Sequence, residues 1–125
     1  MTADPTAEVP ATAPPLVAVL VAHDPGEWFE ETLGSLRDQT YRNLAVLVVD
    51  ASSEEELSPR IAEVLPEARV HRLDRNPGFG AAANVVRDLV DGAAFYAFIH
   101  DDVALEPDSL RALVEEAYRS NAGII

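Results

Sequence analysis

The sequence predicts an α/β fold in which a mostly parallel sheet carries helices on both faces. Four short apolar runs recur along the chain, without the polar alternation of a strand that has one face in water. After each run comes a segment whose apolar residues have helical spacing. Repeated strand–helix units of this kind are typical of parallel sheets with right-handed crossovers.

The first half of the chain contains two of these units. A strand is expected over residues 16–22, and the turn Asp24-Pro25-Gly26 ends it. A helix is expected over residues 27–39, and a second strand over residues 44–49 that ends at Asp50. The inward face of the helix should consist of Trp28, Phe29, Thr32, Leu33 and Leu36.

A third unit follows. Ser53-Glu54-Glu55-Glu56 has the capping-box pattern, which predicts the start of a helix that Pro66 ends. A short strand is expected over residues 70–73, and a helix over residues 81–90. The inward residues should be Leu57, Ile61, Val64 and Leu65 in the first helix, and Val85, Val86, Leu89 and Val90 in the second.

The fourth strand is expected over residues 95–99. Pro107 then predicts the start of a helix with Leu110, Leu113 and Val114 inward. Residues 123–125 look like the beginning of a fifth strand. At the other end, residues 1–15 hold four of the nine prolines and little that can form a core, so we expect a disordered leader before a domain over residues 16–125.

Length and composition exclude several functions. The 125 residues fit one domain, and they include 22 acidic and 9 basic residues, for a net charge of −13. Duplex nucleic-acid binders need a basic surface, while Schiff-base enzymes and P-loop nucleotidases need a Lys, which this chain lacks. Without Cys, disulfides, thiol catalysis and cysteine–zinc sites are excluded. No apolar run approaches the ~20 residues of a membrane span, and no signal-peptide pattern is present, so we expect a cytoplasmic domain.

Acidic residues follow three of the predicted strands. Asp24, Asp50 and the pair Asp101-Asp102 should meet at one edge of the sheet, where open α/β proteins bind their ligands. Two adjacent carboxylates repel each other, which favours a divalent cation with oxygen ligands, Mg²⁺ or Mn²⁺, and His100 could join as an imidazole ligand. The alternative is a solvated turn before the next helix.

Three further positions are candidate ligand contacts. The ring of His23 could stack on a base, or it could belong to an exposed loop. Asp50 could accept a hydrogen bond from a ligand, or it could be a turn acid. The segment Asn76-Pro77-Gly78-Phe79-Gly80 precedes a helix whose first N–H groups could meet a phosphate, and the alternative is an ordinary strand-to-helix turn.

Taken together and in order, these segments resemble the N-terminal half of the family 2 glycosyltransferases, which have a GT-A fold. The similarity runs from Leu16 to Ile125. Residues 31–41 resemble the family's ETLxSL…QTY run, and residues 48–52 its VVDxxS segment. Residues 76–84 resemble its NxGFG…N loop and helix, although Ala83 replaces an Arg that many members have.

The family's DXD motif falls on His100-Asp101-Asp102, where His replaces the first Asp. The resemblance implies that Asp50 binds the base of a nucleotide-sugar donor, that Asp101 contacts the ribose or sugar, and that Asp102 holds the metal at the diphosphate. The full donor site would consist of His23, Asp50, Asn76, Gly78 and Asp101, with Asp102 and His100 at the Mg²⁺ or Mn²⁺ ion.

The reaction implied by the resemblance is inverting transfer of a sugar to a glycan or lipid-linked acceptor, as in cell-envelope polysaccharide synthesis. The acceptor site and the catalytic base would lie in a second half, so we expect this chain to be the donor-binding part of a longer enzyme, inactive alone and near a membrane only through that enzyme. This predicts an exposed apolar sheet edge near residues 95–99 or 124–125. The alternatives are a receiver-like signalling domain and a non-catalytic nucleotide- or metal-binding module.

Overall fold

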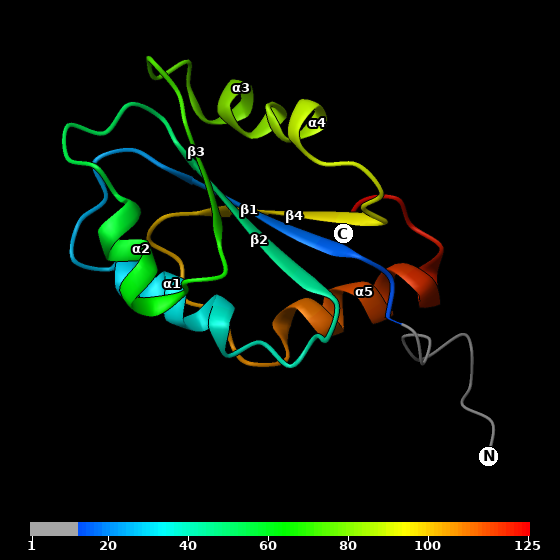
Figure 1. The fold of residues 1–125 in the computed structure, drawn as a ribbon. Helices are drawn as coiled ribbons and strands as arrows, with labels where there is room; N and C mark the ends of the chain where they lie inside the picture. Colours follow the sequence, from blue (N-terminus) through cyan, green and yellow to red (C-terminus); the bar gives the residue numbers. More distant parts are fainter. Residues whose placement is uncertain (1–12) are drawn as a thin grey trace.

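The computed structural model describes residues 13–125, so residues 1–12 of the predicted leader lie outside the described residues. Strands and helices alternate along the described chain (Figure 1). The elements are β1 (Leu16–Ala22), α1 (Phe29–Arg37), β2 (Leu44–Asp50), α2 (Ser58–Val64), β3 (Arg69–Arg72), α3 (Phe79–Asn84), α4 (Val86–Leu89), β4 (Phe95–His100) and α5 (Ser109–Ser120).

The strands form one parallel sheet in the order β3-β2-β1-β4. Helices α1, α2 and α5 cover one face of the sheet, and α3 and α4 cover the other (Figure 1). The parallel sheet with helices on both faces confirms the predicted fold class. No helix within residues 13–125 has the length and apolar character needed to cross a membrane.

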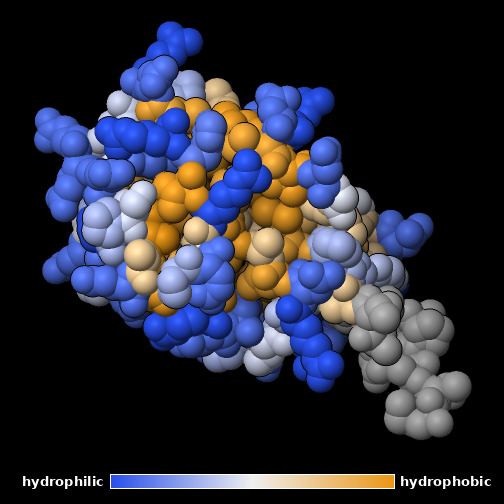
Figure 2. Space-filling view, in the orientation of Figure 1, coloured by the Kyte–Doolittle hydropathy of each residue, from blue (hydrophilic) through white to orange (hydrophobic). Residues whose placement is uncertain are grey.

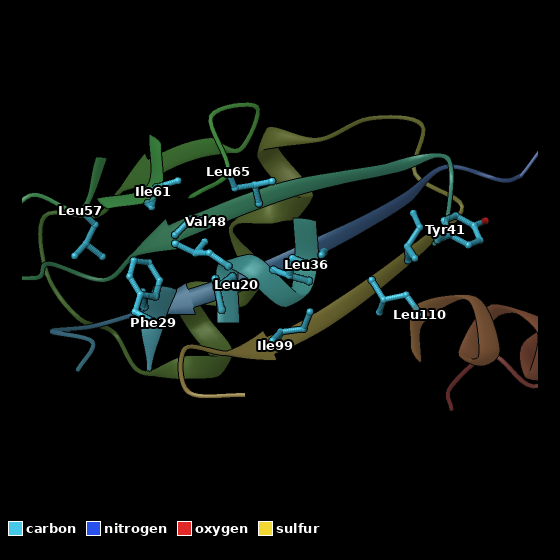
Figure 3. Close-up of a cluster of buried hydrophobic side chains, with 14 of the residues drawn as sticks. Leu20, Phe29, Leu36, Tyr41, Val48, Leu57, Ile61, Leu65, Ile99 and Leu110 are labelled. Atoms are coloured by element: carbon cyan, nitrogen blue, oxygen red, sulfur yellow. The ribbon is translucent and has the colours of Figure 1, made fainter. Parts of the chain in front are cut away.

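Strand β1 is the centre of the core because all of its residues are buried. Its side chains alternate between the two faces, so that Leu20 packs with α1 and α2 while Val19 packs with α3. Figure 3 shows the larger cluster, in which Leu20 lies beside Phe29 and Ile99. Burial of one such Leu or Phe side chain contributes about 2 kcal/mol, so this cluster fixes the strands that position the candidate site.

Helix α1 is shorter than the expected range 27–39, and the predicted bounds of the next two helices were wrong. Helix α2 begins at Ser58 rather than just after Ser53, because the Ser53 hydroxyl is buried and accepts a hydrogen bond from the N–H of Asp24 instead of capping a helix. The helix expected over residues 81–90 begins at Phe79 and is divided at Val85 into α3 and α4.

Two residues predicted to face the core are exposed. The exposed fraction is 57% for Trp28 and 44% for Leu113. Trp28 precedes the first residue of α1, where Phe29 takes the inward position. Trp28 is the N-cap residue of α1, and its side chain lies mostly in solvent. Helix α5 begins at Ser109, two residues later than Pro107 predicted.

The outer edge of β4 is apolar and open. Within residues 13–125 β4 pairs only with β1, and Tyr96 and Phe98 on it are exposed. A groove of about 700 Å³ runs between this edge and α5. Residues 123–125 line the groove without forming the expected fifth strand. The exposed apolar edge predicted from the sequence is therefore present. Figure 2, in the orientation of Figure 1 with β3 in front, also shows a broad apolar area in the middle of the molecule.

Candidate functional site

The strands β1, β2 and β4 end together at one edge of the sheet. Their parallel register places Ala22 beside Asp50 and Val21 beside His100. The residues that follow these strand ends, His23 and Asp101, consequently lie at the same edge as Asp50. The predicted convergence of Asp24, Asp50 and the pair Asp101-Asp102 at one edge agrees with the structure.

The Asp50 carboxylate is buried at the end of β2, and each of its two oxygens has one hydrogen-bond partner. Its Oδ1 accepts a hydrogen bond from the N–H of Ser53 at 2.9 Å, and its Oδ2 lies 2.7 Å from Nη1 of Arg72. A second Arg72 nitrogen, Nη2, donates to the Ser53 carbonyl. The sequence did not point to Arg72, because only the pairing of β3 with β2 brings this residue to Asp50. The Arg72 guanidinium neutralises a carboxylate that would otherwise be a buried lone charge.

His23 connects three strand ends. Its backbone N–H donates to Asp101 Oδ2 at 3.2 Å, which joins the β1 and β4 loops. Its ring atom Nδ1 lies 2.7 Å from the carbonyl oxygen of Ala51, which can only accept, so we assign a proton to Nδ1. Nε2 lies 3.3 Å from Asp24 Oδ2. The imidazole is thus held in one orientation beside the Asp50 loop.

The loops after β1 and β2 are tied together by residues in left-handed conformation. Asp24 has φ of 43° and Ser52 has φ of 62°, values that residues other than Gly seldom adopt. The Asp24 N–H donates to Ser53 Oγ, and Asp24 Oδ1 accepts the N–H of Glu54. Ser52 Oγ donates to the Asp74 carbonyl in the loop after β3. These bonds retain the strained backbone and fix three neighbouring loops.

The acidic pair follows β4 directly. Besides its bond from His23, Asp101 accepts a hydrogen bond at its carbonyl from Thr32 Oγ1 in α1. The Asp102 carboxylate is exposed and has no hydrogen-bond or ion-pair partner among residues 13–125. Within the same residues no group of three or more His, Asp or Glu side chains is arranged to hold a metal. Two neighbouring carboxylates can still supply part of an oxygen ligand set for Mg²⁺ or Mn²⁺.

His100 and the loop before α3 contact each other. The His100 ring stacks on Phe79 with ring centroids 4.1 Å apart and planes inclined by 18°. Just before Phe79, Gly78 has φ of 97°, and its N–H donates to Asn76 Oδ1 at 3.0 Å. The N–H of Gly78, a predicted donor-site residue, therefore has an internal partner in an Asx-type turn.

Arg60 connects helix α2 to the loop after β1. Its guanidinium donates to both carboxylate oxygens of Glu30 and to the carbonyls of Pro25 and Gly26, and it lies 5.1 Å from the centre of the Phe29 ring. The hydrogen bond from Arg60 lowers the pKa of Glu30 below its usual value. The pair fixes α2 against the start of α1, next to the residues that precede the site.

The large groove beside β4 lies apart from most of these groups. It is lined by His100 and Val103 at its end nearest the site, whereas His23, Asp50 and Asp101 do not line it. The candidate site is therefore an open polar edge held together by hydrogen bonds, and it is not an enclosed cavity.

A parallel α/β sheet with a buried acid, a held imidazole and an acidic pair at its carboxyl edge has its polar groups where open α/β domains bind their ligands. The sequence profile described as Glycosyl transferase family 2 matches residues 17–125. The chain therefore belongs to glycosyltransferase family 2 and has its GT-A fold. No curated protein sequence matches this chain.

Solved structures agree in fold. The crystal structure of S. aureus TarS 1-349 is 20% identical, with a TM-score of 0.72 over 82% of this chain and 32% of that chain. The complex of the same protein with UDP-GlcNAc is 22% identical, with a TM-score of 0.70 over 82% and 31% of the two chains. The mannosyltransferase PcManGT from Pyrobaculum calidifontis, in complex with GDP-Man and Mn²⁺, is 22% identical, with a TM-score of 0.73 over 89% and 34%. The chain thus spans about a third of the length of these structures.

Proposed function

We propose that the carboxyl edge of this domain binds a nucleotide-diphosphate sugar, with Asp50 and His23 at the base and Asp101 at the ribose or sugar. The observation that carries the proposal is the link through His23, which bonds to Asp101 on one side and to Ala51, next to Asp50, on the other. A carboxylate accepts about four hydrogen bonds, and two at Asp50 are filled, so acceptor capacity is left for a base N–H. Asn76 and Gly78 complete the donor site beside α3.

A divalent cation, Mg²⁺ or Mn²⁺, fits the acidic pair. Asp102 would hold it, because its carboxylate is exposed and unpaired within residues 13–125 and has Asp101 as its neighbour. When bound, the cation supplies Lewis-acid stabilisation of the departing diphosphate. The net charge of −13 favours such a cation, since an acidic edge without one repels a diphosphate.

The reaction we propose is inverting transfer of the sugar to a glycan or lipid-linked acceptor, carried out by a longer polypeptide. Two observations support a longer enzyme. The matched structures extend over about three times the matched length, and the β4 edge and its groove are apolar and uncovered in the described residues. The acceptor site and the catalytic base would then lie in the part that covers this edge, and the 125 residues alone would bind a donor without transferring its sugar.

Nucleotide titration tests the proposal. UDP and GDP are titrated with and without Mn²⁺ while thermal stability is followed, because a ligand at ~100 times its Kd adds about 2.7 kcal/mol to the free energy of unfolding. We expect stabilisation by one of the nucleotides that depends on Mn²⁺. Asp102→Asn should abolish the Mn²⁺-dependent part of the shift.

The matched control is Asp91→Asn, which removes the same charge from an exposed acid near the amino end of β4. It should leave the Mn²⁺-dependent shift intact. If both variants lose the Mn²⁺-dependent shift equally, the shift depends on overall charge, and the assignment of Asp102 as the metal ligand is contradicted. A non-catalytic nucleotide-binding module gives the same binding, and transfer of a labelled sugar by the longer protein distinguishes it from an enzyme.

A further inference from the structure

The stack of His100 on Phe79 joins two segments that leave opposite edges of the sheet. His100 is the last residue of β4, one outer strand, and Phe79 follows the loop that leaves β3, the other outer strand. The loop after β3 therefore reaches across the ends of β2 and β1 to contact β4. The residues at these inner strand ends are Asp50 and His23, which belong to the candidate donor site.

The two partners differ in how firmly they are held. Phe79 is half-buried and packs against the core cluster on the α3 side of the sheet. His100 is exposed, on a strand that has a neighbour on one side only. An unsupported strand end at a sheet edge frays readily, because few buried contacts oppose its opening. The ring contact connects this end to the core and so supports Asp101, which directly follows His100.

We propose that the Phe79–His100 pair, termed the aromatic clasp, positions the acidic pair and the β3–α3 loop around the donor, and that His100 serves through the face of its ring rather than as a metal ligand. Two observations favour this role over ligation. The ring is stacked nearly parallel on Phe79. Asp101, the residue after His100, is the one that bonds to His23. The role in donor binding rests on the proposed function, whereas the positioning itself is a property of the protein without ligand.

Amide hydrogen exchange in the absence of ligand tests the positioning. The N–H of His23 donates to Asp101, and the N–H of Ala82 donates to the Gly78 carbonyl in the first turn of α3, so the two amides report on the two sides of the clasp. His100→Ala and Phe79→Ala should each raise exchange at both amides. His100→Phe, which keeps a stacking ring and removes both nitrogens, should keep exchange at the wild-type level.

Binding of UDP or GDP with Mn²⁺ to the same variants tests the choice between ring and nitrogen. His100→Ala and Phe79→Ala should raise Kd about fivefold, the effect of one aromatic pair, and His100→Phe should stay within about twofold. Loss of Mn²⁺ dependence in His100→Phe, or unchanged exchange in His100→Ala, would overturn the proposal. Should the wild-type protein bind neither nucleotide, the proposed function fails, while hydrogen exchange still decides whether the clasp exists.

Discussion

Arg72 and Asp50 are direct neighbours across β3 and β2, and Nη1 of the one lies 2.7 Å from Oδ2 of the other. Residues paired in this way on adjacent strands have their side chains on the same face of the sheet. The carboxylate is buried, whereas 46% of the Arg72 side chain is exposed. Arg72 therefore neutralises the buried Asp50 charge from the solvent side. The hydrogen bond from Arg72 to the Ser53 carbonyl also fixes the loop after β2.

Arg72→Met should lower the free energy of unfolding by about 2 kcal/mol. The substitution keeps the apolar stem but leaves the Asp50 charge unpaired, and the cost stays below that of breaking a fully buried pair because Arg72 is half exposed. Urea unfolding measures the loss. Combining it with Asp50→Asn should cost less than the sum of the two single substitutions, since no lone charge remains.

The control for this cycle is Arg75→Met, at an exposed Arg in the loop after β3. It should change stability by less than about 0.5 kcal/mol. Additive effects of Arg72→Met and Asp50→Asn would show that the two side chains contribute independently, contrary to the geometry.

The sequence predicted the strands and their common edge well because both depend on local patterns and on a general rule of parallel sheets. The uninterrupted apolar run of β1 could be read without knowledge of its neighbours. The partner of Asp50 could not be predicted in this way, because Arg72 reaches Asp50 only through the pairing of β3 with β2. The helix start predicted at Ser53 failed for a similar reason, since the Ser53 hydroxyl accepts a bond from Asp24, distant in sequence, that no local pattern contains.

The adjacent aromatic residues Trp28 and Phe29 should respond very differently to truncation. Phe29 is fully buried and Trp28 is 57% exposed. Phe29→Ala should cost about 3–5 kcal/mol of unfolding free energy, because it opens a cavity in the cluster of Figure 3. Trp28→Ala should cost less than about 1 kcal/mol. If urea unfolding shows comparable losses of stability in the two variants, the assignment of Phe29, and not Trp28, to the core is contradicted.

The ion pair of Glu30 and Arg60 should make stability depend on pH in the acidic range. The hydrogen bond from Arg60 lowers the pKa of Glu30 below its usual value of 4.5. The contribution of the pair is therefore fully present above pH 4.5 and is lost as pH falls through the lowered pKa of the folded state.

Thermal melts of the wild-type protein and Glu30→Gln test this sign. The wild-type advantage should be largest at neutral pH and should shrink with acidification below pH 4.5. Glu31→Gln, at the neighbouring exposed glutamate, should leave stability at neutral pH nearly unchanged. A wild-type advantage that grows as pH falls would show that the pair is not the source.

The open edge of β4 should make the 125-residue chain self-associate. Unpaired backbone groups of an outer strand next to exposed apolar side chains favour association with other chains. Phe98 is 51% exposed there, so Phe98→Ser should reduce association strongly while lowering stability by only about 1 kcal/mol. Its neighbour Ile99 is buried, and Ile99→Ser should instead destabilise the fold, by more than about 2 kcal/mol. Sedimentation velocity across a concentration series measures association, and urea unfolding measures stability. The β4 edge is not the surface through which the chains associate if the wild-type chain stays monomeric throughout the series. The same conclusion follows if Phe98→Ser associates as strongly as the wild type.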